Sequence, residues 1–361
     1  NGAFIDLSVL PYNPALEMPV ILDVPFSGGG AAREVFGRCL KLVQCSKEGA
    51  EILARERELE AGGSESVGRR RLMASNLLGE EQTRRLEQER GGEENTAPVN
   101  VHPMFIADAR KDQMNNPEEE LILVEKEISQ GGAPNAPPFD PPLRMEVVYA
   151  STYVNVDCTT PPGIDRGIAK NLVTSNMADV IYSPDMHDVA RLFAPPLQAY
   201  GRAVAMVRHP IARAVAEYER RKERDAEVKK MTLEEFARSD HLKDNILTKA
   251  IAGRDDLAIA KEILKRKFLV GLFDRMDASI ERLEIFLHWN NIGNDVRACQ
   301  REEVVREMAE PHNHDLELPL EGSPTWISLM EKNGLDMVLF DYAKFLFDYQ
   351  GHALFGIPAS S

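Results

Sequence analysis

The chain has 361 residues, of which 43% are hydrophobic and 7% aromatic, so it is long enough to bury one large core or two modest ones. Its formal net charge is −15. This balance excludes a general positive field for phosphates, so we expect no nucleic-acid partner and place any anionic ligand in a local pocket.

The first predicted element is a buried strand over Val20–Val24, which runs into a turn with three glycines at positions 28–30. A helix is predicted from Ala31 to about Ala54. Strand, glycine turn and helix together aim backbone N–H groups and the positive helix end at a phosphate. The alternative is a purely structural turn, because no Gly-Lys-Ser/Thr ending follows, and this also disfavours a P-loop kinase.

A charged insertion is predicted at residues 50–145, within a single domain that spans 1–361. Residues 55–94 contain runs of Glu and Arg with almost no aromatic side chains, and 131–142 is rich in Pro and Gly. This composition is typical of a mobile segment.

Strands and helices alternate after residue 145. Strands are predicted at 146–149, 153–156, 179–183, 203–207 and 268–272. Helices are predicted at 165–174, 186–193, 210–230, 245–253, 257–267 and 276–289, with another that begins at 232 and one or two over 326–349. The strand at 203–207 ends on Arg208, and Pro210 opens the next helix. The alternation predicts the α/β class, with a mainly parallel sheet flanked by helices and a ligand outside the carboxyl ends of the strands.

The chain has four cysteines, which are too few for a disulfide scaffold and have no metal-ligand spacing: Cys39, Cys45, Cys158 and Cys299. One or two disulfides would form in an oxidising compartment, and the pairing stays open. No apolar run reaches the roughly 18 residues of a membrane span. The chain begins at Asn1 rather than at a methionine, so membrane contact is expected only through an anchor upstream of it.

Several stretches resemble the membrane-associated, Golgi-type carbohydrate sulfotransferases, and most of all the sulfotransferase-domain proteins of algae and diatoms. Val24-Pro25-x-Ser27-Gly28-Gly29 is similar to their 5′-phosphosulfate loop, and Val207-Arg208-His209-Pro210-x-x-Arg213-Ala214 to their 3′-phosphate motif. The stretches 154–161, 232–236 and 268–272 also match. The resemblance covers roughly residues 20–48 and 147–350.

This resemblance implies a P-loop-kinase-like sulfotransferase fold in the Golgi lumen or secretory pathway. It implies transfer of a sulfuryl group from 3′-phosphoadenosine 5′-phosphosulfate, without a metal, to a hydroxyl on a glycan or another acceptor. The residues that it implies for the donor are Ser27, Gly28, Gly29, Gly30, Ala31, Arg33 and Arg208, with Arg208 on the 3′-phosphate.

The resemblance also implies a base for the acceptor proton. Asp157 stands where many sulfotransferases carry this carboxylate, and His187 is the second candidate. The alternatives are a turn or N-cap aspartate before Thr159 and Thr160, and a surface histidine.

Four positions depart from the family. Phe26 replaces the usual lysine, whose charge stabilises the leaving phosphate; Gly30 and Ala31 stand where hydroxyl residues are usual; and Ala216 replaces a serine of the 3′-phosphate motif. Arg33 and Lys170 are the nearest candidates to replace the missing charge. The alternative function is therefore a degenerate, non-catalytic relative that binds nucleotide or glycan.

Overall fold

A computed structural model describes residues 3–61, 140–193, 199–290, 293–310, 313 and 316–357. The chain divides into two units, one formed by residues 1–52 and 142–361 and the other by residues 53–141. Most of the insertion predicted at 50–145 lies outside the described residues, so its mobility stays a prediction. The larger unit contains the sheet.

The described residues form a seven-stranded sheet in the order β3-β4-β2-β5-β1-β6-β7. The strands are β1 (Glu17–Leu22), β2 (Val43–Cys45), β3 (Met145–Val148), β4 (Ser151–Val154), β5 (Val180–Ser183), β6 (Tyr200–Val207) and β7 (Phe268–Leu272). Every neighbouring pair is parallel except β3 and β4. The predicted α/β class with a mainly parallel sheet is confirmed.

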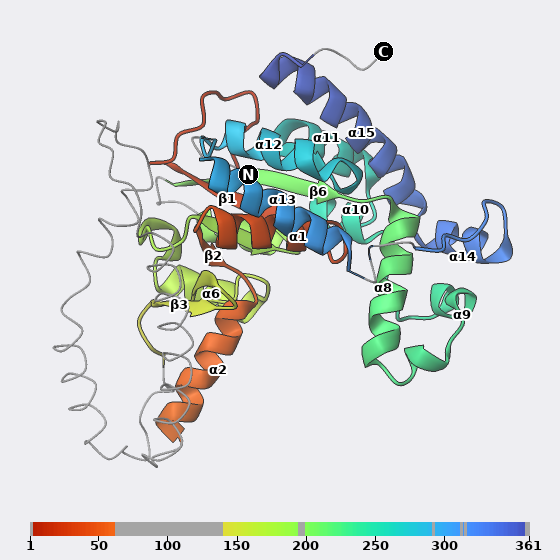
Figure 1. Ribbon diagram of the computed structural model, residues 1–361, viewed down its shortest axis with the longest axis horizontal. Coiled ribbons are helices and arrows are strands. Elements are labelled where there is room, and N and C mark those ends of the chain that lie inside the picture. Colours follow the sequence, from red (N-terminus) through yellow and green to blue (C-terminus); the bar gives the residue numbers. More distant parts are fainter. Residues whose placement is uncertain are drawn as a thin grey trace. The chain divides into compact units, whose positions relative to one another are not determined.

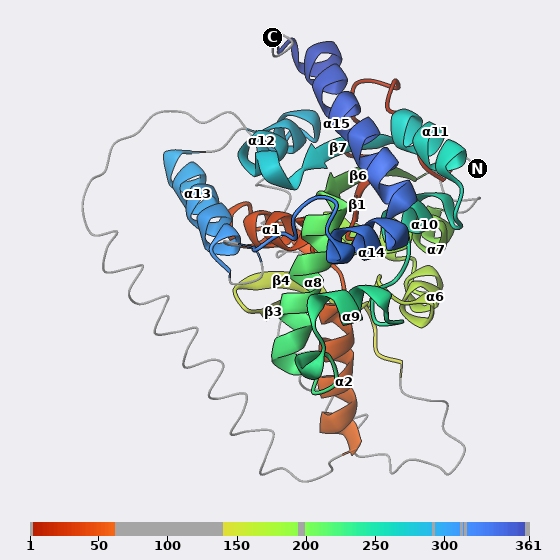
Figure 2. The same ribbon diagram turned by 90° about the vertical axis from the view of Figure 1, so that its right-hand side faces the viewer.

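Helices cover both faces of this sheet. The helices of the unit are α1 (Gly29–Glu34), α6 (Pro161–Ala169), α7 (Met186–Val189), α8 (Pro210–Arg224), α9 (Leu233–Arg238), α10 (Ile246–Ala252), α11 (Leu257–Lys267), α12 (Met276–Phe286), α13 (Asn294–Met308), α14 (Pro324–Lys332) and α15 (Gly334–Phe355), and α2 (Glu48–Ala61) runs from it into the second unit. Figure 1 shows α8 continuing from β6, and Figure 2 shows α1 and α13 on one side of the strands with α10 and α11 on the other.

The core follows the alternation of side chains along the buried strands. Val20 and Leu22 of β1 join a cluster completed by α10, α11 and α15, whereas Ile21 joins a second cluster with α1 and α12. Since both faces of β1 are covered, its residues from Met18 to Leu22 are apolar, which is why the strand could be recognised from composition.

The edge of the sheet departs from the parallel pattern. Tyr149 and Ala150 have φ angles of 50° and 68° and connect Val148 directly to Ser151, so β3 and β4 form a two-residue hairpin. The predicted strands at 146–149 and 153–156 are thus an antiparallel pair, each beginning and ending a residue or two before its predicted bounds.

The helix predicted from Ala31 to Ala54 is wrong. The chain makes α1, a π-helical turn at Val35–Cys39, the strand β2 and then α2. Lys41 has a φ of 58°, which ends the helical run, and the three residues of β2 are all buried between β4 and β5. A strand this short leaves too little periodicity to be recognised in the sequence.

Two further helix predictions need correction. The helix predicted at 165–174 begins at Pro161, because Thr160 accepts a hydrogen bond from the Gly163 N–H and proline is tolerated in a first turn; it ends at Ala169. No helix is predicted between residues 289 and 326, but α13 lies there; it buries only Gln300 and Val304 and so shows no apolar periodicity.

Candidate functional site

The glycine-rich loop lies between β1 and α1, at the carboxyl edge of the parallel strands. Gly28 has a φ of 103°, and a Cβ there would lie 2.9 Å from the Met276 side chain. A Cβ on Gly29 would lie 2.0 Å from Oδ1 of Asp23. Phe26 has a φ of 64°, although it carries a side chain. The backbone conformation therefore favours glycine at position 28, and close packing against Asp23 requires glycine at position 29.

Arg208 follows β6, the strand next to β1, and its side chain reaches this loop. Its Nη1 donates to the main-chain oxygen of Phe26 (3.3 Å) and to Oδ1 of Asn313 (2.6 Å). The guanidinium carbon lies 4.0 Å from the ring centroid of Phe273. Burial lowers the pKa of Arg208 to about 10, against the effect of Asp274 and Glu307, so the side chain keeps its charge at neutral pH. The structure thus brings together the two stretches that the sequence singled out.

Two residues at this site were missed by the sequence interpretation. Nδ2 of Asn313 donates to the main-chain oxygen of Glu307 (3.0 Å) and to its Oε1 (3.4 Å). Oε1 of Glu307 lies 3.4 Å from the position of a Cβ on Gly30. Burial raises the pKa of Glu307, and Glu310 and Glu34 raise it further. No motif marks either residue in the sequence.

Arg33 does not point its charge into open space above the loop. Its Nη1 lies 3.7 Å from Asp23 and 3.4 Å from Glu48, and its guanidinium carbon lies 5.8 Å from the ring centroid of Tyr182. Burial raises the pKa of Asp23, an effect that Arg33 opposes. Two carboxylates therefore offset the charge of Arg33. Its proposed role as a replacement for the missing lysine stays a prediction.

Asp157 lies beyond the end of β4 and is buried. Its Oδ1 accepts hydrogen bonds from the N–H (2.9 Å) and Oγ1 (2.6 Å) of Thr159, and its Oδ2 from Oγ1 of Thr160 (3.2 Å). β4 is the third strand from β1, at a spacing of about 4.8 Å per strand. These contacts are those of the turn alternative, and the role as a base stays a prediction.

His187 follows β5, the other neighbour of β1. Its Nε2 lies 3.1 Å from the main-chain oxygen of Ile251, and Oδ1 of Asp185 accepts a hydrogen bond from its main-chain N–H. Beside it is a surface pocket lined by Pro184, Asp185, Ile246, Lys249, Ala250, Gly253, Arg254 and Asp255. The structure therefore places His187, exposed, next to a cavity one strand from the loop.

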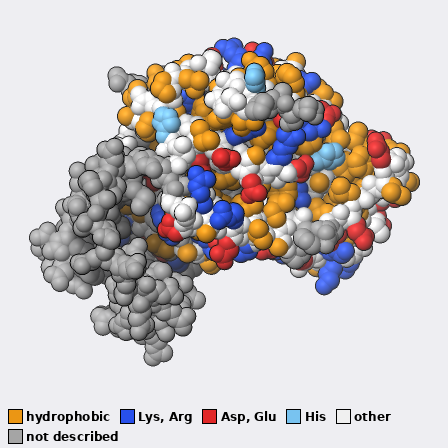
Figure 3. Space-filling model, turned by 45° about the horizontal axis from the view of Figure 1, so that its top comes forward, with side chains coloured by type: hydrophobic (Ala, Val, Ile, Leu, Met, Phe, Trp, Pro, Cys, Tyr) orange, Lys and Arg blue, Asp and Glu red, His pale blue; other side chains and the backbone are white. Residues whose placement is uncertain are grey.

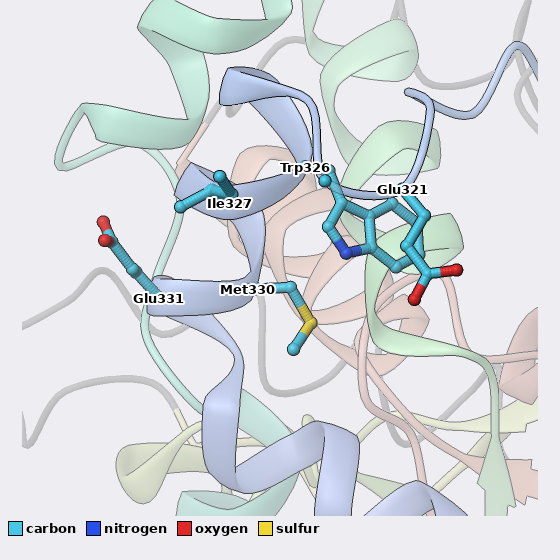
Figure 4. Close-up of a pocket in the computed structure, with 6 residues that line it drawn as sticks. Glu321, Trp326, Ile327, Met330 and Glu331 are labelled. Carbon is cyan, nitrogen blue, oxygen red and sulfur yellow. The ribbon is translucent and has the colours of Figure 1, made fainter.

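A second pocket lies on α14 and is more apolar. Figure 4 shows the Trp326 indole and the Met330 thioether on one side of this helix with Glu321 beside the indole, whereas Ile327 and Glu331 point to the other side. The Trp326 ring centroid is 6.2 Å from that of His209, the residue after Arg208. The indole that lines this pocket thus lies near His209, which follows β6.

Two disulfides connect the segments around the site. Cys39 pairs with Cys299, which fastens the π-helical turn after α1 to α13, and Cys45 pairs with Cys158, which joins the end of β2 to the turn of Asp157. The pairing that the sequence left open is thereby assigned.

The charges on one face of the molecule are mixed. On the face drawn in Figure 3, basic and acidic side chains lie among one another rather than in one basic expanse. Among the described residues, no helix has both the length and the apolar character needed to cross a membrane, and no three His, Cys, Asp or Glu side chains are grouped as metal ligands would be. No protein-family model matches the chain, and no curated protein does either.

Proposed function

We propose that this protein transfers a sulfuryl group from 3′-phosphoadenosine 5′-phosphosulfate to a hydroxyl, on a glycan. The observation that carries the proposal is the hydrogen bond from Arg208 to the Phe26 carbonyl. It joins the stretch similar to a 3′-phosphate motif to the stretch similar to a 5′-phosphosulfate loop. A single nucleotide that carries both a 5′-phosphosulfate and a 3′-phosphate requires these two stretches to lie close together.

The donor would lie along the carboxyl ends of β1 and β6. Backbone N–H groups of the loop from Ser27 to Ala31 would bind the 5′-phosphosulfate, and Arg208 would bind the 3′-phosphate through charge-assisted hydrogen bonds. The indole of Trp326 lies 6.2 Å, ring centroid to ring centroid, from His209, the residue after Arg208, and would offer an aromatic face for the adenine. The central position of β1 in a parallel sheet supports a P-loop-kinase-like sulfotransferase fold as part of the proposal.

The reaction would move the sulfuryl group from the phosphate oxygen of the donor to the acceptor oxygen and leave 3′-phosphoadenosine 5′-phosphate. The acceptor proton would pass to Asp157 or to His187. The cavity beside His187 offers room for an acceptor one strand from the loop, whereas Asp157 is already hydrogen-bonded within its own turn.

The Golgi lumen or the secretory pathway is the proposed setting. Two disulfides that tie distant segments together support it, because disulfides persist in oxidising compartments and are rare in reducing ones.

A second candidate function is that of a non-catalytic relative that binds the nucleotide or a glycan. Three observations favour it: Phe26 replaces the lysine, Arg33 is paired with Asp23 and Glu48, and Asp157 is closed on its own turn. Both candidates share the nucleotide site.

Calorimetric titration with 3′-phosphoadenosine 5′-phosphate tests the shared part of the proposal. We expect saturable binding, and weaker binding of adenosine 5′-phosphate, which lacks the group that Arg208 would hold. Absence of binding by both nucleotides would contradict the proposed function in either form. Transfer of labelled sulfate from the donor to glycans then separates an enzyme from a binding protein.

A further inference from the structure

The loop proposed for the 5′-phosphosulfate has a carboxylate of the protein itself above it. Oε1 of Glu307 lies 3.4 Å from the position of a Cβ on Gly30, which is contact distance from the first turn of α1. Gly30 has no side chain, so it leaves this space to Glu307. A carboxylate in this place repels an incoming anion.

The same carboxylate is connected to Arg208. Asn313 donates from Nδ2 to the main-chain oxygen and to Oε1 of Glu307. Its Oδ1 accepts from Nη1 of Arg208 at 2.6 Å. A guanidinium, an amide and a carboxylate therefore form a chain from β6 to α13. An anion that binds Arg208 competes with this chain for the same donor.

Glu307 is held in position through α13. The disulfide between Cys39 and Cys299 fastens this helix, and Glu303 pairs with Arg38 at 3.6 Å. Arg306 also pairs with Glu34 at 3.5 Å. Since α13 buries little apolar surface, these connections are what fixes the carboxylate above the loop.

We propose that Glu307 determines the anion affinity of this site: its carboxylate competes with the ligand phosphate for the space above Gly30 and, through Asn313, for Arg208. The nucleotide then binds tightly only when Glu307 has gained a proton or has moved away. This inference rests on the proposed function and adds a specificity-determining residue to it.

The surroundings of Glu307 raise its pKa, so its protonated form becomes more populated as the pH falls. Glu310 lies at the end of its own helix, Glu34 and Arg33 face it from α1, and Arg208 lies beyond Asn313. Around them the charges of Glu303, Arg38 and Arg306 are paired. Burial and the two neighbouring glutamates raise the pKa of Glu307, while Arg33 and the hydrogen bond of Asn313 oppose them. Binding should accordingly strengthen as the pH falls.

The test is calorimetric titration of the full chain with 3′-phosphoadenosine 5′-phosphate at about pH 5.5 and about pH 8. Glu307→Gln keeps the shape of the side chain and its ability to accept from Asn313 but removes the charge. At the higher pH we expect this variant to bind about tenfold more tightly than the natural chain, and the difference between the two should narrow as the pH falls. Comparing variants at one pH cancels the ionisation of the nucleotide itself.

Glu302→Gln is the matched control, because it removes a carboxylate from an exposed position of the same helix and leaves the ion pairs of Glu303 and Arg306 in place. We expect it to bind like the natural chain at both pH values. If Glu307→Gln does not fold, Glu307→Ala takes its place in the same series.

Three results would overturn the inference. If the natural chain binds and Glu307→Gln binds equally well or more weakly at the higher pH, Glu307 does not oppose the ligand and the proposed function stands alone. If Glu302→Gln binds as tightly as Glu307→Gln, the effect is one of overall charge. If no variant binds at either pH, both the inference and the proposed function are wrong.

Discussion

Two turns follow parallel strands at the same edge of the sheet, and they use their polar groups differently. The turn after β1 is hydrogen-bonded by a residue from another strand, because Arg208, which follows β6, donates to the carbonyl of Phe26. The turn after β4 is closed on itself, because Asp157 accepts from Thr159 and Thr160. A place at the carboxyl edge is thus not sufficient for a site; what distinguishes the first turn is that a charged side chain from the end of another strand donates to its backbone.

The backbones of the two turns differ in the same sense. Phe26 adopts a φ of 64°, a conformation that costs about 1–2 kcal/mol for a residue with a side chain, whereas no residue from 157 to 160 has a positive φ. Backbone strain of this kind gathers at functional loops. The turn after β4 instead serves the fold, since Thr160 caps α6.

The largest expected effect is that of Arg208→Ala on the nucleotide. It should weaken binding of 3′-phosphoadenosine 5′-phosphate by about 1.5–3 kcal/mol, the contribution of hydrogen bonds to a charged group. Adenosine 5′-phosphate should be nearly unaffected in the same titrations. Arg220→Ala, which removes a cation from the exposed side of α8, is the control. Equal losses for both nucleotides would remove Arg208 from the 3′-phosphate and break the contrast between the two turns.

The next effect concerns Phe26. A lysine in this position would add a cation beside the leaving phosphate, where one preorganised electrostatic donor contributes on the order of 10²–10³ in turnover. Phe26→Lys should therefore raise sulfuryl transfer, or donor hydrolysis, about tenfold or more at matched donor saturation. Phe26→Met controls for the change in side-chain shape. A natural protein that is already fast and is slowed by Phe26→Lys would mean that the cation comes from elsewhere.

The smallest effect is expected at the second turn. Asp157→Ala should lower the free energy of unfolding, measured with urea, by about 1–2 kcal/mol, because three donors lose their acceptor. Nucleotide affinity should stay unchanged.

Asp157→Asn separates the two roles of this residue, because the amide oxygen still accepts within the turn but cannot take a proton. If Asp157 only shapes its turn, sulfuryl transfer persists in this variant. Loss of transfer with full stability would instead assign the base to Asp157.

The sequence allowed the sheet and the loop to be predicted because both depend on local patterns. Buried parallel strands contain continuous apolar runs, so β1, β6 and β7 were recognised. The capping box of Thr232 and Glu235 forms with both hydrogen bonds. The short strand β2 and the helix α13 were missed, because neither shows a periodic apolar face.

The contacts across the site could not be predicted in the same way. Asn313 contacts Arg208 across 105 positions of sequence, and Glu307 is still farther in sequence from the loop that it contacts. Their own sequence context is an ordinary polar stretch. Arg33 was singled out as a spare cation, but Asp23 and Glu48 face it only once β1 and β2 lie in one sheet. Pairing between distant side chains follows from strand order, which local patterns do not encode.

Hydrogen exchange measured by mass spectrometry, with and without 3′-phosphoadenosine 5′-phosphate, compares the two turns in one experiment. The account predicts slower exchange in peptides that cover residues 23–34 and 203–214, because the nucleotide binds the loop and the end of β6 together. Peptides over 155–165 should exchange as before. Protection of 155–165 alone, or of only one of the first two segments, would contradict a donor site shared by the glycine-rich loop and Arg208.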